Sequence, residues 1–206
     1  MIDRYALAIL KPAAEHAARR LAARGLSADQ VSLAGFAIGL LAALTIALGF
    51  PAPAIVPLLL NRALDGIDGA MARLSQATDR GAFIDIGLDF LFYAAIPLGF
   101  AFADPGANAL AAAVLLAAFV GTGTSFLAYA VIAEKRGLKS EAYPTKSFYY
   151  LGGLTEGAET IVAFLAMCWW PQYFSGIAYV YAAMCTVTTV TRLLAGWQAF
   201  GGDARS

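Results

Sequence analysis

The sequence has few charged residues, very little cysteine and a single histidine. Its 206 residues include 14 Lys or Arg and 14 Asp or Glu, so the formal net charge is zero. Cys168 and Cys185 lack CxxC spacing and the histidine is His16, which argues against a disulfide framework or a zinc site and leaves both cysteines as packing residues. Without a basic excess, no nucleic-acid partner is expected.

Apolar residues make up 60% of the chain. A helix of about 20 apolar residues crosses the roughly 30 Å hydrocarbon core of a bilayer. Runs of comparable or greater length without a charged residue are 31–50, 105–133 and 161–191, and the shorter run 90–103 also has none. The composition therefore predicts an all-α integral membrane protein in contact with membrane lipid.

Turn-forming residues divide these runs. Breaking the chain at "GFPAPA", "ADPGAN" and "WWPQYFS" predicts six transmembrane helices, near 31–49, 53–73, 82–102, 108–133, 147–169 and 174–198. These three turns contain no Lys or Arg, whereas the opposite ends of the spans are basic. By the positive-inside rule both termini are cytoplasmic, and a multi-pass protein of a bacterial inner membrane is expected. The membrane domain would cover 27–200, with a cytoplasmic tail at 201–206.

Residues 1–26 are predicted to form an amphipathic juxtamembrane helix. Apolar side chains recur at helical spacing on one face, and Arg4, Lys11, Glu15 and Arg19 lie on the other. The same charges argue against a cleavable signal peptide. The pattern fits an interfacial helix at headgroup level, and it fits equally well a cytosolic helix packed on the bundle.

Four aspartates gather at the inner ends of the second and third spans. Asp65 and Asp68 are three residues apart, and Asp85 and Asp89 are four apart, so each pair shares one helix face. The polar loop between them is expected to fold the two helix ends side by side. Asp79, in that loop, does not fit the spacing and is interpreted as a solvated turn residue. Charged groups at membrane depth are costly and usually functional.

Four carboxylates can be balanced by two divalent cations. Oxygen-only ligands favour Mg²⁺ or Mn²⁺, with Ca²⁺ as a non-catalytic substitute. Metals held by carboxylates commonly serve phosphate substrates. Gly69 and Ala72 leave room for a nucleotide beside the aspartates, Arg73 can pair with phosphate, and Gly81 either admits close backbone approach or is a turn glycine.

The fixed positions Asp65, Asp68, Gly69, Ala72, Arg73, Gly81, Asp85 and Asp89 resemble the signature of the CDP-alcohol phosphatidyltransferases, class I. The resemblance implies that Asp65, Asp68, Asp85 and Asp89 form the metal site and that Asp89 is the catalytic base. It implies nucleotide contacts at Asp65, Gly69, Ala72, Arg73 and Gly81. Many members begin their first span with Pro-Asn, whereas this chain has Ala28 and Asp29 there.

The reaction implied by the resemblance is metal-dependent transfer of a phosphatidyl group, or a related substituted phosphate, from a CDP-alcohol to an acceptor alcohol. CMP is released, and the reaction belongs to phospholipid biosynthesis. The expected partners are a CDP-linked lipid, most simply CDP-diacylglycerol, a small alcohol acceptor and a second copy of the chain in a homodimer. The active site would face the cytoplasm.

The acceptor side is less defined. Lys135, Arg136, Lys139 and Lys146 form a basic inner loop that would suit a phosphorylated acceptor such as glycerol 3-phosphate, although inner loops are basic for topological reasons too. Lys146 is the preferred acceptor contact. Arg192 is predicted to pair with Glu156 or Glu159 beside the active cavity, with a purely structural ion pair as the alternative.

Two other functions fit an acid cluster in a membrane. A small transporter would place its site near the bilayer midplane at a repeat interface, and no internal repeat is visible. An intramembrane prenyltransferase would place two Asp-rich motifs on distant helices, whereas here all four aspartates lie within residues 65–89. CMP release from a CDP-lipid discriminates the three.

Overall fold

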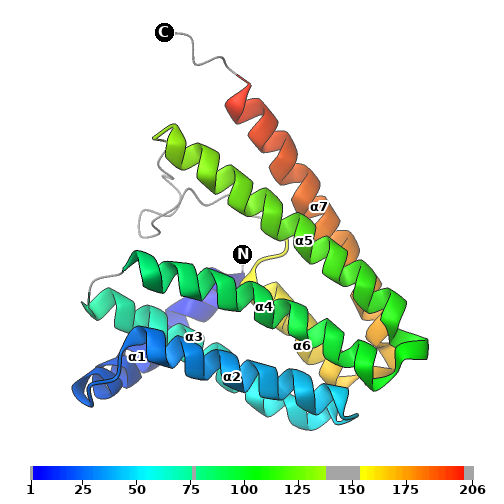
Figure 1. Ribbon diagram of the computed structural model, residues 1–206, viewed down its shortest axis with the longest axis horizontal. Helices are drawn as coiled ribbons and strands as arrows, with labels where there is room; N and C mark the ends of the chain where they lie inside the picture. Colours follow the sequence, from blue (N-terminus) through cyan, green and yellow to red (C-terminus); the bar gives the residue numbers. More distant parts are fainter. Residues whose placement is uncertain (1, 76–77, 138–153, 202–206) are drawn as a thin grey trace.

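The structure, a computed structural model, describes residues 2–75, 78–137 and 154–201, with side chains from Lys11 onward. The described residues form seven α-helices and one short 3₁₀ turn, which confirms the all-α fold (Figure 1). The helices are α1 (Ile2–Ala23), α2 (Ala28–Ala47), α3 (Pro51–Ser75), α4 (Asp79–Ala103), α5 (Pro105–Lys135), α6 (Gly157–Trp169) and α7 (Phe174–Phe200), with η1 (Pro171–Tyr173) before α7.

The helix starts that frame the acid cluster have local causes. Ser27 caps α2 in a capping box, in which its side chain accepts from the backbone N–H of Gln30 and the Gln30 side chain accepts from that of Ser27. Thr78 caps α4 by accepting from the N–H of Gly81 at 3.1 Å. Such caps satisfy backbone donors that a helix start leaves free. They fix where α2 and α4 begin, at the end of the bundle that carries the aspartates.

Among the described residues, four helical segments are long and apolar enough to cross a membrane: α2, α4, α5 and the η1–α7 segment. Because six spans were predicted, the number of spans is confirmed only in part. The second half of α3 carries Arg62, Asp65, Asp68 and Arg73, which lowers its hydropathy. The prediction of one continuous helix over 147–169 is wrong, because Leu154 and Thr155 are not helical and α6 begins at Gly157 with only 13 residues. Residues 147–153 lie outside the described part.

The described helices form a bundle in which neighbours in space are not always neighbours in sequence. α2 packs on both α3 and α4, α4 packs on α5, and α5 packs on α7, while α6 contacts α3 and α7. The α2–α3, α4–α5 and α6–α7 turns, none of which contains Lys or Arg, lie together at one end of the molecule (Figure 1). α3 and α4 approach each other closely at few points. The space between them is where the acid cluster lies.

An aromatic cluster forms the centre of the bundle. Phe92 and Tyr93 of α4 contact Phe164 of α6, and Phe119 of α5 contacts Phe164 and Tyr181, with ring centroids about 6 Å apart. Three of these four pairs are edge-to-face, an arrangement that is favourable between rings, and the Tyr93–Phe164 pair is tilted. These pairs join α4, α5, α6 and α7 around one apolar core, on which the charged end of α3 rests.

Close contacts between helices depend on glycines of α2 and α4. A Cβ on Gly39 of α2 would lie 2.6 Å from the Phe92 ring and 2.9 Å from the Asn61 amide nitrogen. A Cβ on Gly99 of α4 would lie 2.6 Å from the Ala43 carbonyl oxygen. Small residues at such positions let membrane helices approach closely. Gly35, one turn before Gly39 on α2, also lies at a close contact, since a Cβ on it would lie 3.2 Å from the Leu64 Cβ.

Replacing Gly99 with Ala is expected to destabilise the protein by about 1 to 2 kcal/mol, because the added methyl would displace α4 from the α2 backbone. Gly87, also in α4, is the matched control, since a Cβ there would have nothing within 4 Å. Gly87→Ala should be neutral or stabilising by up to about 1 kcal/mol. Thermal unfolding of the purified proteins in detergent measures both. Equal midpoints for the two variants would contradict the close α2–α4 contact.

The described part of α1 packs on the charged end of the bundle. Ala18 is fully buried and lies in one cluster with Val31 of α2 and Ala70 and Met71 of α3. His16, on another side of the helix, is exposed. Of the two arrangements predicted for this segment, packing on the bundle is thus confirmed, and placement at a membrane surface stays a prediction.

Candidate active site

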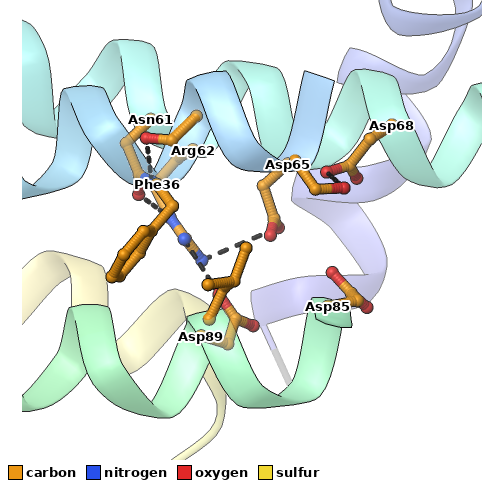
Figure 2. A pocket seen from close by; sticks show the side chains of 10 residues that line it. Phe36, Asn61, Arg62, Asp65, Asp68, Asp85 and Asp89 are labelled. Carbon is orange, nitrogen blue, oxygen red and sulfur yellow. Dashed lines mark hydrogen bonds and ion pairs between the residues drawn. The ribbon is translucent and has the colours of Figure 1, made fainter. Parts of the chain in front are cut away.

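The four predicted site aspartates come from two helices that face each other. Asp65 and Asp68 lie on α3, and Asp85 and Asp89 lie on α4, with α2 packed against both helices. All four line one pocket, together with Ser32, Gly35, Phe36, Asn61, Arg62 and Leu88 (Figure 2). The predicted convergence of the two helical pairs is confirmed. Asp79, set apart in the sequence, is exposed in the first turn of α4 and does not line the pocket.

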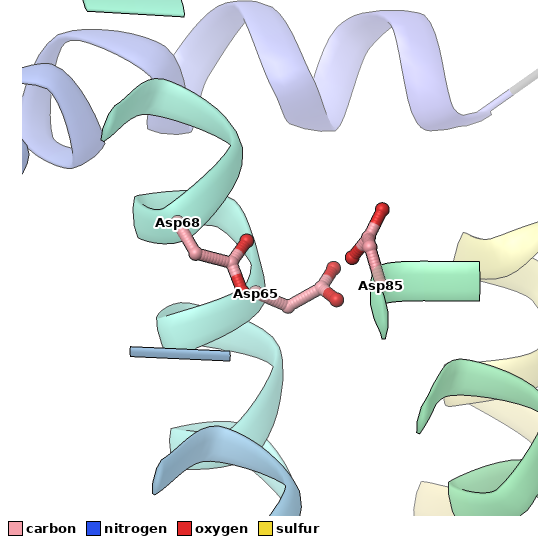
Figure 3. Close-up of side chains that lie close together, drawn as sticks. All are labelled: Asp65, Asp68 and Asp85. Atoms are coloured by element: carbon pink, nitrogen blue, oxygen red, sulfur yellow. The ribbon is translucent and has the colours of Figure 1, made fainter. Parts of the chain in front are cut away.

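Three of the carboxylates converge on one point. Asp65, Asp68 and Asp85 each offer an oxygen, and these oxygens lie within 4.8 Å of one another (Figure 3). Oxygens that share one divalent cation are separated by at most about 4 to 5 Å, twice a metal–oxygen distance of roughly 2.0 to 2.6 Å. The donor set is all oxygen, which suits Mg²⁺, Mn²⁺ or Ca²⁺. The residues therefore fit a shared divalent cation.

Asp68 is oriented by a hydroxyl of α2. The Ser32 hydroxyl donates to the Asp68 Oδ2 at 2.5 Å, and Asp68 is buried. Hydrogen bonds to a ligating carboxylate fix its orientation. Sequence reasoning missed Ser32, because serine is common on membrane helices and nothing in its local spacing relates α2 to the aspartates.

Asp89, the fourth aspartate, is turned toward an arginine. The Arg62 Nη2 lies 2.9 Å from the Asp89 Oδ1, and the Arg62 Nη1 lies 3.6 Å from the Asp65 Oδ2. Figure 2 shows the guanidinium between the two carboxylates. Arg62 thus bridges α3 and α4 at the edge of the three-carboxylate cluster.

Arg62 is itself held on several sides. Its Nε donates to the Asn61 Oδ1 at 2.7 Å, and the Asn61 amide donates to the Gly35 carbonyl of α2 at 2.8 Å. Its guanidinium carbon lies 4.6 Å from the centre of the Phe92 ring and 5.6 Å from that of Tyr93. The sequence analysis assigned no role to Arg62, although its position one turn before Asp65 places both side chains on one face.

Of the predicted nucleotide contacts, Asp65 lines the pocket, whereas Gly69, Ala72 and Arg73 lie beyond it along α3. Gly69 follows Asp68 directly, and the one atom within 4 Å of a Cβ on Gly69 would be the Arg73 Nη1 at 3.5 Å. Ala72 is half-buried and Arg73 is exposed. The backbone at Gly69 is therefore open to a flat group with Arg73 beside it. None of these three residues lines the acidic pocket.

Gly81 lies at a junction between α2 and α4. A Cβ on it would lie 3.2 Å from the Thr78 hydroxyl and 3.3 Å from the Asp29 Oδ1. Asp29 in turn pairs with Arg80, whose Nη2 and Nε lie 2.6 and 2.9 Å from the Asp29 Oδ2. Asp29, at the position where many family members have Asn, thus ties the start of α2 to the start of α4. Close packing accounts for Gly81 without a ligand.

The predicted acceptor residues lie on other helices. Arg192 of α7 is buried, and its Nη1 donates to the Thr122 carbonyl of α5 at 3.2 Å. Glu156 lies at the N-cap of α6, where its backbone N–H donates to the Glu159 Oε2 at 3.3 Å. Neither Arg192 nor Glu156 lines the acidic pocket, and their predicted pairing stays a prediction. Lys139 and Lys146 lie outside the described residues.

Thr155, just before α6, and Arg136, just after α5, both contact α7. The Thr155 hydroxyl and N–H both donate to the buried Thr188 hydroxyl of α7, at 3.0 and 3.2 Å, which holds the start of α6 against α7. Arg136 donates to the Phe200 carbonyl at 2.9 Å and lies over the Phe200 ring. Cationic groups stabilise helix C-termini. Arg136, one of the predicted basic-loop residues, thus caps the end of α7.

A model of the CDP-alcohol phosphatidyltransferase family matches residues 26–191. The inner membrane protein YnjF of Escherichia coli (strain K12) is 50% identical over 197 residues, which cover 96% of each chain. The family match includes every residue of the acidic pocket, and it includes Arg73 and Gly81.

The fold resembles that of phosphatidylinositol phosphate synthase from Mycobacterium tuberculosis. A crystal structure of that protein with CDP-DAG bound matches with a TM-score of 0.72 at 22% identity and covers 89% of this chain and 93% of the solved one. A second, with manganese and citrate, matches with a TM-score of 0.70 at 23% identity and covers 89% and 88%. At these identities the likeness shows a shared fold.

Proposed function

Because the chain belongs to the CDP-alcohol phosphatidyltransferase family, we propose that it transfers a phosphatidyl group from a CDP-linked lipid to an acceptor alcohol with release of CMP. The observation that carries the proposal is the convergence of Asp65, Asp68 and Asp85, three positions of the motif, within 4.8 Å. CDP-diacylglycerol is the simplest donor, and the solved phosphatidylinositol phosphate synthase of the same fold has CDP-DAG bound.

The protein is proposed to be an integral membrane enzyme with six spans and both termini in the cytoplasm. The Lys- and Arg-free turns at one end support this orientation, since basic residues favour the cytoplasmic side. The acidic pocket lies toward the other end of α3 and α4 and would face the cytoplasm. A CDP-linked lipid would then enter from the inner leaflet, with its tails in the bilayer.

Asp65, Asp68 and Asp85 are proposed to hold a divalent cation, Mg²⁺ or Mn²⁺, and a second cation would bind with the substrate beside Asp89. The relative solved with manganese supports this choice of metal. Bound cations of this kind polarise phosphoryl oxygens and neutralise charge on the leaving group. Ser32 keeps the Asp68 carboxylate turned toward its neighbours.

Donor binding and proton transfer are assigned to residues of α3 and α4. Arg73 would bind the pyrophosphate while the nucleotide lies on the bare backbone at Gly69, with Ala72 leaving it room. The acceptor oxygen forms a bond to the phosphorus that carries the lipid alcohol, and the bond from that phosphorus to the CMP oxygen breaks. Asp89 would accept the proton of the acceptor hydroxyl, as a general base within reach of the pocket.

The acceptor is proposed to be a small, phosphorylated alcohol. Arg192 is a buried cation on α7, and Lys146 belongs to the basic loop before α6. A phosphate group would find charge-assisted donors there. Glu156, at the start of α6, would orient the acceptor hydroxyls or Arg192. Transport and prenyl transfer lack comparable support, because the family match covers the whole acidic pocket.

The reaction is tested by supplying purified protein with radiolabelled CDP-diacylglycerol, Mg²⁺ or Mn²⁺ and one acceptor at a time. The expected result is metal-dependent CMP release, largest with a phosphorylated acceptor such as glycerol 3-phosphate or inositol phosphate. Serine, free inositol and a phospholipid acceptor complete the set, and CDP-choline with diacylglycerol tests the other donor class. EDTA should stop the reaction.

No CMP release with any donor and acceptor would contradict the proposed activity. Equal rates with phosphorylated and unphosphorylated acceptors would contradict the acceptor class alone. The assay therefore separates the proposed chemistry from the proposed acceptor.

A further inference from the structure

The acidic pocket is lined by four carboxylates and one cation. Asp65, Asp68, Asp85 and Asp89 supply the carboxylates, and Arg62 is the one basic residue among the described residues that line the pocket. Like charges a few ångströms apart repel strongly at the low effective dielectric of a protein interior. Arg62 therefore offsets one of four negative charges. The distances from its guanidinium to the carboxylates show which charge that is.

Arg62 lies closer to Asp89 than to Asp65. The Nη2–Oδ1 distance to Asp89 is 2.9 Å, a charge-assisted hydrogen bond, whereas the Nη1–Oδ2 distance to Asp65 is 3.6 Å. Asp65 still shares the close cluster with Asp68 and Asp85, and Asp89 does not. Arg62 thus makes its shortest ion pair with the one aspartate that lies outside the close cluster of three.

The pose of the guanidinium is fixed from outside the cluster. Asn61 is buried, accepts from the Arg62 Nε and donates to the α2 backbone at Gly35. The Phe92 ring supports one face of the guanidinium, and Gly39 allows that ring and the Asn61 amide to lie against α2. The Arg62 side chain is 16% exposed. The planar fork of arginine suits this arrangement, and a lysine could not reproduce it.

We propose that Arg62 is a positioning residue that holds the Asp89 carboxylate outside the three-carboxylate metal site, so that Asp89 remains available to accept the acceptor proton. Without Arg62, Asp89 would turn toward the cation bound by the other three aspartates. The part of the proposal that concerns proton transfer rests on the proposed function. The part that concerns metal binding does not.

The test is Mn²⁺ binding to the purified protein, without donor or acceptor, followed by electron paramagnetic resonance. Arg62→Met keeps an unbranched apolar side chain and removes the charge and the fork. It should bind Mn²⁺ at least about tenfold more tightly than the wild type, because a nearby positive charge is lost and a fourth carboxylate becomes available. CMP release should fall by at least about tenfold, mainly in kcat.

Arg80→Met is the matched control, because Arg80 is the other arginine with an ion pair to an aspartate in the described residues and lies outside the pocket. Its Mn²⁺ affinity should equal that of the wild type. The double variant Arg62→Met/Asp89→Asn isolates the role of Asp89, since it should lose part of the tightening seen in Arg62→Met. Arg62→Lys, which keeps the charge without the fork, should bind Mn²⁺ with intermediate affinity and recover little turnover.

Unchanged or weaker Mn²⁺ binding by folded Arg62→Met would overturn the proposal, as would a double variant that binds Mn²⁺ as tightly as the single one. If Arg62→Met does not fold, Arg62→Lys decides the question, and wild-type values in both assays would contradict the proposal. A wild-type protein that binds Mn²⁺ but releases no CMP would contradict the proposed function and leave the metal-binding test of Arg62 intact.

Discussion

Asp85→Asn is expected to lower CMP release by roughly 10³-fold or more. Asp85 is one of three carboxylates that converge on the proposed cation, and it is the most exposed of them. A bound cation supplies several kcal/mol of charge stabilisation, and each 1.4 kcal/mol is about a factor of ten in rate. Asparagine keeps the shape but not the charge, so the fold should be retained while metal affinity falls.

Asp79→Asn is the matched control for this variant, because Asp79 is on the same helix, is exposed and does not line the pocket. Its CMP release and Mn²⁺ affinity should stay at the wild-type level. The measurements are initial rates over a Mn²⁺ titration and Mn²⁺ binding by electron paramagnetic resonance. Wild-type Mn²⁺ affinity in Asp85→Asn would show that the three-carboxylate cluster is not the metal site.

Asp89→Asn is expected to lower kcat by about 10² to 10⁴, the usual contribution of a general base. Asp89 is held by Arg62 and lies apart from the close cluster. The Mn²⁺ affinity of the Asp89→Asn variant without substrate should therefore differ much less from that of the wild type than the affinity of Asp85→Asn does. The pair of variants thus separates metal binding from proton transfer. Thermal unfolding of both in detergent controls for the lost ion pair with Arg62.

Equal losses of Mn²⁺ affinity in Asp85→Asn and Asp89→Asn would contradict this separation and would place Asp89 among the ligands of the first cation. Wild-type turnover in Asp89→Asn would contradict its role as the base. Neither outcome depends on which acceptor the enzyme uses, provided that one acceptor supports measurable CMP release.

Helical periodicity was sufficient to predict which aspartates share a face, because spacings of three and four residues fix that geometry within one helix. It placed Asp65 with Asp68 and Asp85 with Asp89, and the structure confirms both pairs at one pocket. Periodicity could not place Arg62 or Ser32. Their contacts with Asp89 and Asp68 cross between helices and depend on how closely α2 packs against α3 and α4, which Gly35 and Gly39 decide.

The start of α6 could not be predicted from hydropathy alone. The segment before Gly157 is apolar enough to continue a span, and Glu156 and Glu159 looked like charges inside a continuous helix. In the structure they lie at a helix start, where Glu159 accepts from the backbone of Glu156 and Thr155 binds Thr188 of α7. Backbone groups at membrane depth need such partners. The acids therefore have a local role that composition did not suggest.

The described residues that line the acidic pocket all lie between Ser32 and Asp89, in three consecutive helices. Since chains fold from the N-terminus during synthesis, every one of these side chains has been made before α5 exists. The described residues of α5, α6 and α7 contribute no side chain to the pocket lining, so they affect the cluster only through packing, as Phe164 of α6 does against Phe92.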